Sequence, residues 1–444
     1  MRGLTERLRG VLTTGSEPRA SASRGDGADA ERAAAQQAVR DARIADALGG
    51  DWCTARTHPF LRVERRYAPG HRHGRMPVVD AAPPASGYWP SLPLLMTRPG
   101  ERAGFDDSGT RSGRLVFLDL ETTGLAGGAG TYAFLVGCAW FDGAALRIRQ
   151  YFLSHIASER ALLEDVAELA RDAAGVVTFN GKTFDIPLIE TRFAMHRLGS
   201  AFAELPHVDM LHVARRLWRR PGEPDDSENP AEGRGCRLSD LEQVICGHER
   251  EGDVPGFEIP ARYFNFVRSG DAGPLEPVFE HNRLDLISLA MLTARAASLL
   301  DEGPEGSRDA REALGLGGLY ERAGQLDAAR TAYGYAATQV GDAVTRAEAL
   351  RAGAVLARRQ RRFDEAAQGW QRVLDVRGCP PGIAREATEA LAVHHEHRQR
   401  DLDRAREFAL QSLQYRGTPS RQQAAHHRLA RLDRKLGRPV APLF

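Results

Sequence analysis

The segment LDLETTGL, residues 118–125, lies in the most regular part of this 444-residue chain and constrains the structure around it. The apolar run Leu115–Leu118 predicts a buried strand. Asp119 and Glu121 are two residues apart, so on a strand both carboxylates point to the same face. Two like charges at the end of a buried strand are costly unless a cation neutralises them, and hard divalent ions favour oxygen ligands. Alone, the pair fits solvated acids at an exposed strand end equally well.

A second candidate segment is FNGKTFDIPL, residues 179–188. An apolar strand runs into a turn that contains glycine, and Asp185 stands where a helix is expected to begin. Asp185 fits an N-cap, a role that is compatible with metal binding. Asn180 and Lys182 are candidates for holding a backbone phosphate, although Lys182 also fits a simple loop charge. Asp209, a fifth nearby acid, is interpreted as a helix cap or as a support for the other acids.

The third segment is HNRLDLISL, residues 281–289. On a helix His281 and Asp285 are four residues apart and therefore share a face. A histidine can exchange a proton near neutral pH. In isolation such a pair is more typical of a helix surface.

Together, the segments predict a cluster of four carboxylates, contributed by Asp119, Glu121, Asp185 and Asp285. Such a cluster can hold two divalent ions, Mg²⁺ or Mn²⁺, about 4 Å apart. The ion pair activates an attacking water and stabilises the leaving oxygen of a phosphodiester. His281 would then be the general base that deprotonates this water.

The rest of the central region predicts an α/β layer of strands and helices. Further strands are expected at residues 132–141, 146–153 and 176–179, and helices at 158–173, 186–198 and 274–300. Ser239 and Glu242 have the spacing of a capping box.

The N-terminal part is less regular. Residues 1–50 are interpreted as an extension, disordered over about the first 30 residues and helical over 31–48. Residues 51–111 are rich in proline and glycine, with a short strand predicted at 60–67. The stretch HRHGR, residues 71–75, fits a metal-binding pair less well than a solvated loop.

The C-terminal part, residues 306–444, is predicted to be all α-helical and repetitive. Ala329, Ala366 and Ala405 occupy equivalent positions at intervals of 37 and 39 residues. The interval is slightly longer than the ~34 residues of a tetratricopeptide repeat. A tetratricopeptide-like array is favoured over a generic helical bundle, because two copies agree at several offsets.

The motifs DLETTG, FNGKTFDIPLI and HNRLD, in this order, resemble those of the DEDD 3′–5′ exonuclease superfamily, which has a ribonuclease H-like fold. The resemblance is closer still to the YprB-type ribonuclease H-like domain, and extends over CRLSDLE (236–242) and VPGFEIP (254–260). It covers about residues 112–300, and residues 62–75 show a weaker resemblance. It implies an exonuclease domain at 112–302, with a mixed sheet flanked by helices, and tetratricopeptide-like repeats after it.

The resemblance also implies roles for individual residues. Asp119, Glu121, Asp185 and Asp285 would bind metal. In the superfamily's third motif, either a Tyr is separated from the Asp by three residues, or a His is separated from it by four. Here three residues separate His281 from Asp285, so His281 either activates water directly or only orients it. Substrate contacts are expected from a further set of residues: Thr122, Thr123, Leu125, Asn180, Lys182 and Asn282. Leu125 fits a wedge against the terminal base and core packing equally well.

The expected function is therefore a metal-dependent nuclease that degrades DNA or RNA from a single-stranded 3′ end. The repeats would bind a protein partner or extend the nucleic-acid path, since residues 305–444 carry 24 Lys+Arg against 17 Asp+Glu, net +7. Two alternatives are a non-catalytic scaffold that binds nucleic acid and a partner, and a phosphoesterase acting on nucleotides.

The cellular setting follows from the composition. Five scattered cysteines without a CxxC motif indicate a reducing, cytoplasmic compartment. No apolar run reaches the ~18 residues of a membrane span, so no membrane association is expected.

Overall fold

The structure, a computed structural model, describes residues 26–55, 58–84, 89–96, 113–124, 130–219, 236–415 and 418–438. The chain forms two units. The first comprises Met1–Pro90, Gly100–Met210 and Leu238–Ala294, and the second comprises Ser91–Pro99, Leu211–Arg237 and Arg295–Phe444. Leu125 and most of the segment predicted to be disordered lie outside the described residues.

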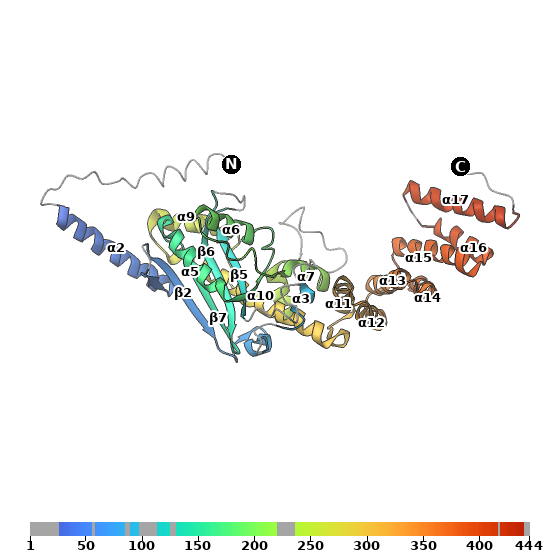
Figure 1. Cartoon of the computed structure of the whole chain (residues 1–444), viewed down its shortest axis with the longest axis horizontal. Helices are drawn as coiled ribbons and strands as arrows, with labels where there is room; N and C mark the ends of the chain where they lie inside the picture. Colours follow the sequence, from blue (N-terminus) through green and yellow to red (C-terminus); the bar gives the residue numbers. More distant parts are fainter. Residues whose placement is uncertain are drawn as a thin grey trace. The chain divides into compact units, whose positions relative to one another are not determined.

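A seven-stranded mixed sheet forms the centre of the first unit (Figure 1). The strand order is β1-β2-β7-β6-β5-β8-β9. Neighbours from β1 to β5 are antiparallel, whereas β5–β8 and β8–β9 are parallel. The strands are β1 (Asp51–Cys53), β2 (Phe60–Tyr67), β5 (Arg114–Thr122), β6 (Ala133–Asp142), β7 (Ala145–Phe152), β8 (Ala173–Thr178) and β9 (His207–Asp209).

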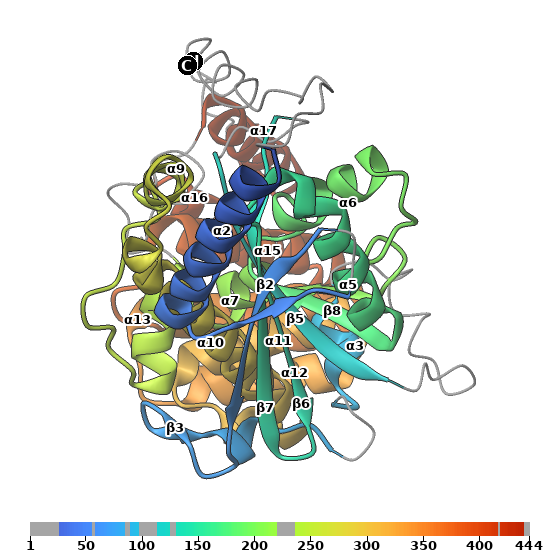
Figure 2. The same ribbon diagram turned by 90° about the vertical axis from the view of Figure 1, so that its left-hand side faces the viewer.

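Helices cover both faces of this sheet. Figure 2 shows α5 and α6 on one side of the strands and α9 and α10 on the other. The helices of this unit are α2 (Asp26–Leu48), α5 (Glu159–Arg171), α6 (Asp185–Met195), the short α8 (Leu238–Leu241) with the π-helix η4 (Glu242–Cys246), α9 (Ile259–Ser269) and α10 (Glu276–Glu302, here to Ala294). The predicted mixed sheet flanked by helices is confirmed.

Aromatic packing fixes α9 and α10 against the sheet. Tyr263 of α9 stacks on Phe134 of β6, with ring centroids 4.2 Å apart, and its hydroxyl donates to the Leu153 carbonyl oxygen at 2.9 Å. Phe279 of α10 meets Phe152 of β7 edge to face, at 5.5 Å. These buried rings hold the start of α10, and therefore the third motif, against the central strands.

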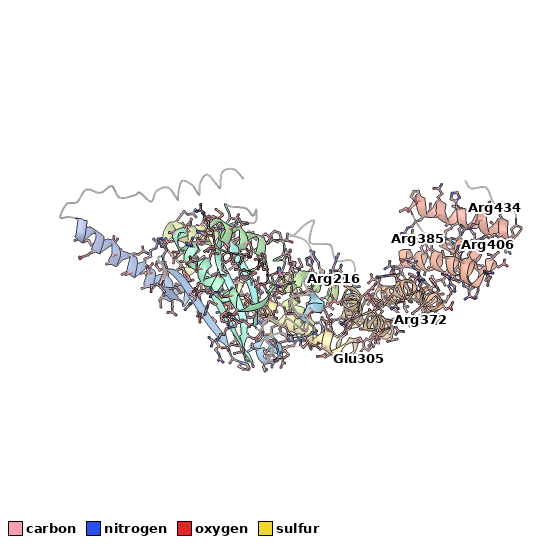
Figure 3. The ribbon with its side chains drawn as sticks, viewed as in Figure 1. Arg216, Glu305, Arg372, Arg385, Arg406 and Arg434 are labelled. Atoms are coloured by element: carbon pink, nitrogen blue, oxygen red, sulfur yellow. The ribbon has the colours of Figure 1, made fainter. Side chains whose placement is uncertain are left out.

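The second unit is largely helical (Figures 1 and 3). Its helices are α3 (Leu92–Leu95), α7 (Met210–Leu217, which begins in the first unit), α11 (Ala310–Arg322), α12 (Leu326–Thr338), α13 (Ala343–Arg359), α14 (Phe363–Leu374), α15 (Pro381–His394), α16 (Leu402–Ser412) and α17 (Pro419–Lys435). From α11 to α17 each helix packs on the next. No helix among the described residues is both long and apolar enough to cross a bilayer.

Small residues permit this helix packing. A Cβ at Gly317 of α11 would stand 2.5 Å from the ring of Tyr333 in α12, so only glycine allows that approach. The repeated alanines Ala329, Ala366 and Ala405 are all buried. The all-α region is as predicted, and its tetratricopeptide character stays a prediction.

Many of the arginines in this region have acidic partners. Arg406 of α16 pairs with Asp433 of α17 at 2.6 Å. The buried Glu396 carboxylate receives Arg428, Arg431 and Lys435. Part of the positive charge of the tail is therefore neutralised within the fold.

Candidate metal centre

The first two acids stand on the central strand β5. Asp119 pairs in register with Gly137 of β6, and Glu121 pairs with Leu135, so the two side chains share a face of the sheet. The pairing shifts after Glu121. Thr123 then closes the strand end, because its backbone N–H donates to the Tyr132 carbonyl oxygen and its hydroxyl accepts from the Tyr132 N–H, both at 3.0 Å.

Two buried amide side chains, Asn282 and Gln150, support Asp119 through a chain of hydrogen bonds. Asn282 of α10 donates through Nδ2 to Asp119 Oδ2 at 2.7 Å. Gln150 of β7 donates in turn to Asn282 Oδ1 at 2.8 Å. Gly137 leaves the space for this arrangement, because a Cβ there would stand 2.8 Å from Asn282 Nδ2. Asn282 is fully buried, which fits support of Asp119 rather than the predicted contact with substrate.

Asp185 approaches β5 from the start of α6. It is the first residue of the helix, and Phe184 is the N-cap residue, without a side-chain capping bond. The carboxylate of Asp185 accepts hydrogen bonds from its own backbone and from the backbone of Leu120, between the two acids of β5. The N-cap interpretation is therefore wrong for Asp185.

Asp209 organises the turn that precedes Asp185. Its two carboxylate oxygens accept the backbone N–H groups of Asn180 (2.8 Å) and Lys182 (3.0 Å). Asn180 has φ 65°, and a Cβ at Gly181 would meet the Thr178 side chain at 2.5 Å. The turn is therefore tightly specified, and Asp209 has the supporting role that was predicted as one of its two options.

Burial and mutual repulsion perturb the acids strongly. Burial, with the Asp285 charge added, raises the pKa of Asp119 to about 7. Burial and then the charges of Asp119, Asp285 and Asp185 raise the pKa of Glu121 well above its ordinary value. The pKa of Asp185 is raised by burial and by Asp119. The four predicted acids therefore lie in one electrostatic cluster, and such perturbed groups are typical of functional sites.

Asp285 and His281 lie one helical turn apart on α10. His281 Nε2 is 3.7 Å from Asp285 Oδ2, and His281 Nδ1 is 2.6 Å from Asp253 Oδ1. Burial alone would lower the pKa of His281, but the hydrogen bond to Asp253 and the charge of Asp285 outweigh it and raise that pKa. Asp253 was not predicted. It immediately precedes the VPGFEIP segment that carries part of the resemblance, and this was the available signal.

The remaining predicted substrate residues are less diagnostic. Thr122 is half-buried, and its hydroxyl donates to the Gly124 carbonyl oxygen at 3.1 Å. Thr123 is buried at the strand end. Asn180 and Lys182 stand half-buried in the turn before Asp185.

Two comparisons with known proteins agree with this architecture. Residues 116–297 match a family model of the RNase H superfamily. The sheet with its flanking helices is an RNase H-like fold. The chain is also 27% identical over 382 residues to the uncharacterized protein YprB of Bacillus subtilis (strain 168). The aligned residues make up 84% of this chain and 85% of that protein. The family match begins within β5, so β1, β2 and residues 72–77 lie outside it.

Proposed function

We propose that this protein is a metal-dependent nuclease that hydrolyses phosphodiester bonds from the 3′ end of single-stranded nucleic acid. The observation that carries the proposal is the cluster of carboxylates on an RNase H-like fold, in which Glu121 is buried and the three aspartates are half-buried. Besides burial, the Asp285 charge raises the pKa of Asp119, and the Asp119 charge raises the pKa of both Glu121 and Asp185. Burying several like charges is unfavourable unless cations compensate, and two divalent ions would do so.

The donor set fits Mg²⁺ or Mn²⁺, because its predicted members are all carboxylates and these ions favour oxygen ligands. Asp119, Glu121, Asp185 and Asp285 would hold the two ions. When bound, the ions would activate the attacking water and stabilise charge on the departing 3′-oxygen.

His281 would act as the proton acceptor through Nε2. Asp253 holds Nδ1 and so keeps a proton on that nitrogen, which leaves Nε2 as the basic atom when the imidazole is neutral. Although only three residues separate His281 from Asp285, the imidazole lies near the acids, since the charge of His281 lowers the pKa of Asp119. Both points favour direct activation of water over orientation alone.

The helices after α10 would bind a protein partner or extend the path of the nucleic acid. The 3′–5′ direction of degradation and the two-ion mechanism rest on the resemblance of the three motifs to those of the DEDD exonuclease superfamily. An alternative function is a scaffold that binds nucleic acid without cleaving it.

The test is degradation of end-labelled single-stranded DNA and RNA with Mg²⁺, Mn²⁺ or chelator. Asp119→Asn keeps the volume of the side chain and removes a ligand charge, whereas Asp142→Asn changes an exposed acid paired with Arg147. We expect metal-dependent shortening from the 3′ end that is lost only in Asp119→Asn. Binding without cleavage under every metal would refute the nuclease and favour the scaffold.

A further inference from the structure

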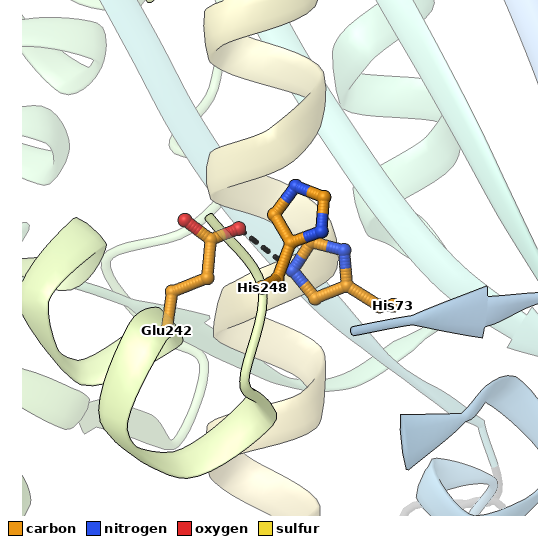
Figure 4. Close-up of side chains that lie close together, drawn as sticks. All are labelled: His73, Glu242 and His248. Atoms are coloured by element: carbon orange, nitrogen blue, oxygen red, sulfur yellow. Dashed lines mark ion pairs between the residues drawn. The ribbon is translucent and has the colours of Figure 1, made fainter. Parts of the chain in front are cut away.

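A second group of titratable side chains lies outside the carboxylate cluster (Figure 4). His73 Nε2 is 2.7 Å from Glu242 Oε1, and the ring of His248 stacks on His73 with centroids 4.2 Å apart. His73 and Glu242 are 2% and 0% exposed. The predicted solvated loop at residues 71–75 is therefore wrong for His73, and the predicted capping role is wrong for Glu242, which points to His73.

Tight backbone contacts lock the segment of His73 in place. His73 ends β3 (Arg72–His73), which pairs with β4 (Met76–Pro77). The Arg75 N–H donates to the Cys246 carbonyl oxygen at 2.7 Å. A Cβ at Gly74, which has φ 58°, would stand 2.6 Å from the carbonyl carbon of Gly247. This hairpin is thus fitted against the end of η4 without room for a side chain between them.

The group offers three ligand atoms within 4.8 Å of one another, a spacing that a metal ion could use. However, both oxygens of Glu242 already have donors. Ser288 donates to Oε1 at 2.6 Å, and Arg250 donates through Nε to Oε2 at 2.5 Å. The hydrogen bonds satisfy this buried carboxylate without an ion, because a buried charge requires paired donors and has them here.

Arg250 connects this group to the carboxylate cluster. Besides Glu242, its guanidinium donates through Nη2 to Asp285 Oδ1 at 2.6 Å and through Nη1 to Asp253 Oδ2 at 3.1 Å. Its side chain is only 6% exposed. One planar guanidinium therefore binds three carboxylates from η4, from the following loop and from α10. An ammonium group lacks that fixed fork of donors.

We propose that Arg250 is a positioning residue, anchored by Glu242 and His73, that sets the orientation of Asp285 and of the Asp253–His281 pair. This inference rests on the proposed nuclease function and adds to it. Arg250 occupies Oδ1 of Asp285 and leaves Oδ2 on the side of His281 Nε2. The same guanidinium holds the carboxylate that orients the imidazole. The hairpin that carries His73 thus supports the site, although it lies outside the region that matches the family.

The test compares Arg250→Lys and Glu242→Gln with a matched control in the full chain. Loss of groups that orient ligands lowers metal affinity or activity by about 10- to 100-fold. We expect both variants to lower kcat by at least about tenfold, with the KM for a single-stranded oligonucleotide within about twofold of wild type. The Mn²⁺ concentration for half-maximal binding, measured by calorimetry, should rise in both. Arg431→Lys removes an equivalent forked contact, to Glu396, and should change neither kcat nor the Mn²⁺ concentration for half-maximal binding.

The double variant separates action through Arg250 from independent effects. Because Glu242 acts on the site through Arg250, Glu242→Gln should cost nothing further in an Arg250→Lys background. Additive losses, or wild-type kcat and Mn²⁺ binding in Arg250→Lys, would overturn the proposal. If Arg250→Lys does not fold, as judged by circular dichroism, Glu242→Gln alone decides by the same criteria.

Two further measurements separate the competing explanations. One equivalent of zinc in the purified protein that disappears in His248→Ala would show a metal site at the histidines and overturn the positioning role of Glu242. If the wild type binds Mn²⁺ but cleaves nothing, the nuclease proposal fails, and weaker Mn²⁺ binding by Arg250→Lys still supports positioning. Absence of both binding and cleavage in the wild type overturns both.

Discussion

Replacing Gly137 by Ala should disturb Asp119 without touching it. The new Cβ would stand 2.8 Å from both Asn282 Nδ2 and Leu286 Cδ1, closer than real Cβ atoms approach their neighbours. Asn282 is fully buried between Gln150 and Asp119, so it cannot move aside without losing hydrogen bonds. The substitution therefore couples overpacking to the loss of support for a predicted metal ligand.

The magnitude follows from these contacts. Overpacking a buried site costs about 1–3 kcal/mol, and weakening a hydrogen bond to a carboxylate costs about 1.5–3 kcal/mol. Gly→Ala gains about 0.4–1 kcal/mol through the unfolded chain. We expect a net loss of about 1.5–5.5 kcal/mol. Gly199→Ala is the control, since its Cβ would meet nothing within 4 Å, and it should be neutral or slightly stabilising.

Hydrogen-exchange mass spectrometry at increasing urea concentrations, read on peptides from β5 and β6, measures this loss locally. Gly137→Ala should accelerate exchange in both strands and raise the Mn²⁺ requirement of the protein. Adding Asn282→Ser should restore protection only in part, because the smaller side chain makes room for the methyl group but no longer donates to Asp119. Equal stability of Gly137→Ala and Gly199→Ala would refute the reasoning.

Further predictions concern individual charges. The pKa of Asp119 is raised in the folded state to about 7, so the metal-free protein should lose stability as pH rises from about 4 to 7; thermal melts should show this fall, and Asp119→Asn or Mn²⁺ should reduce it. The pKa of Glu396 is lowered to about 2, so this carboxylate should stabilise the fold above about pH 4.5 and lose that effect as the pH falls toward 2. Thermal melts of Glu396→Gln should lack this acid sensitivity. Asp209→Asn removes a carboxylate that accepts two backbone N–H groups and should cost about 1–3 kcal/mol, read by hydrogen exchange in residues 179–185. His281→Asn should lower cleavage by about 10²- to 10⁴-fold and flatten its rise with pH, whereas retained Mn²⁺ binding would separate this effect from loss of the metal centre.

Local patterns were sufficient for much of the candidate site. An apolar run predicted β5, and the two-residue alternation of a strand placed Asp119 and Glu121 on one face. The i,i+4 relation placed His281 beside Asp285 on α10. Strand β2 was predicted at its observed bounds, Phe60–Tyr67. Strands β1 and β9 were missed because three residues are too few to show a period.

The sequence by itself determined which main segments form helices or strands and which side chains share a face, because the periods of helix and strand extend over only a few neighbouring residues. Only the tertiary structure decided which polar groups support the acids. Asn282 reaches Asp119 across 163 residues, and His73 reaches Ser288 across 215. Arg250 and Asp253 lie in a segment without a period, and their partners stand on other elements. Their roles arise when the folded sheet and α10 bring distant segments together, since a buried charge must find its partner wherever the fold places one.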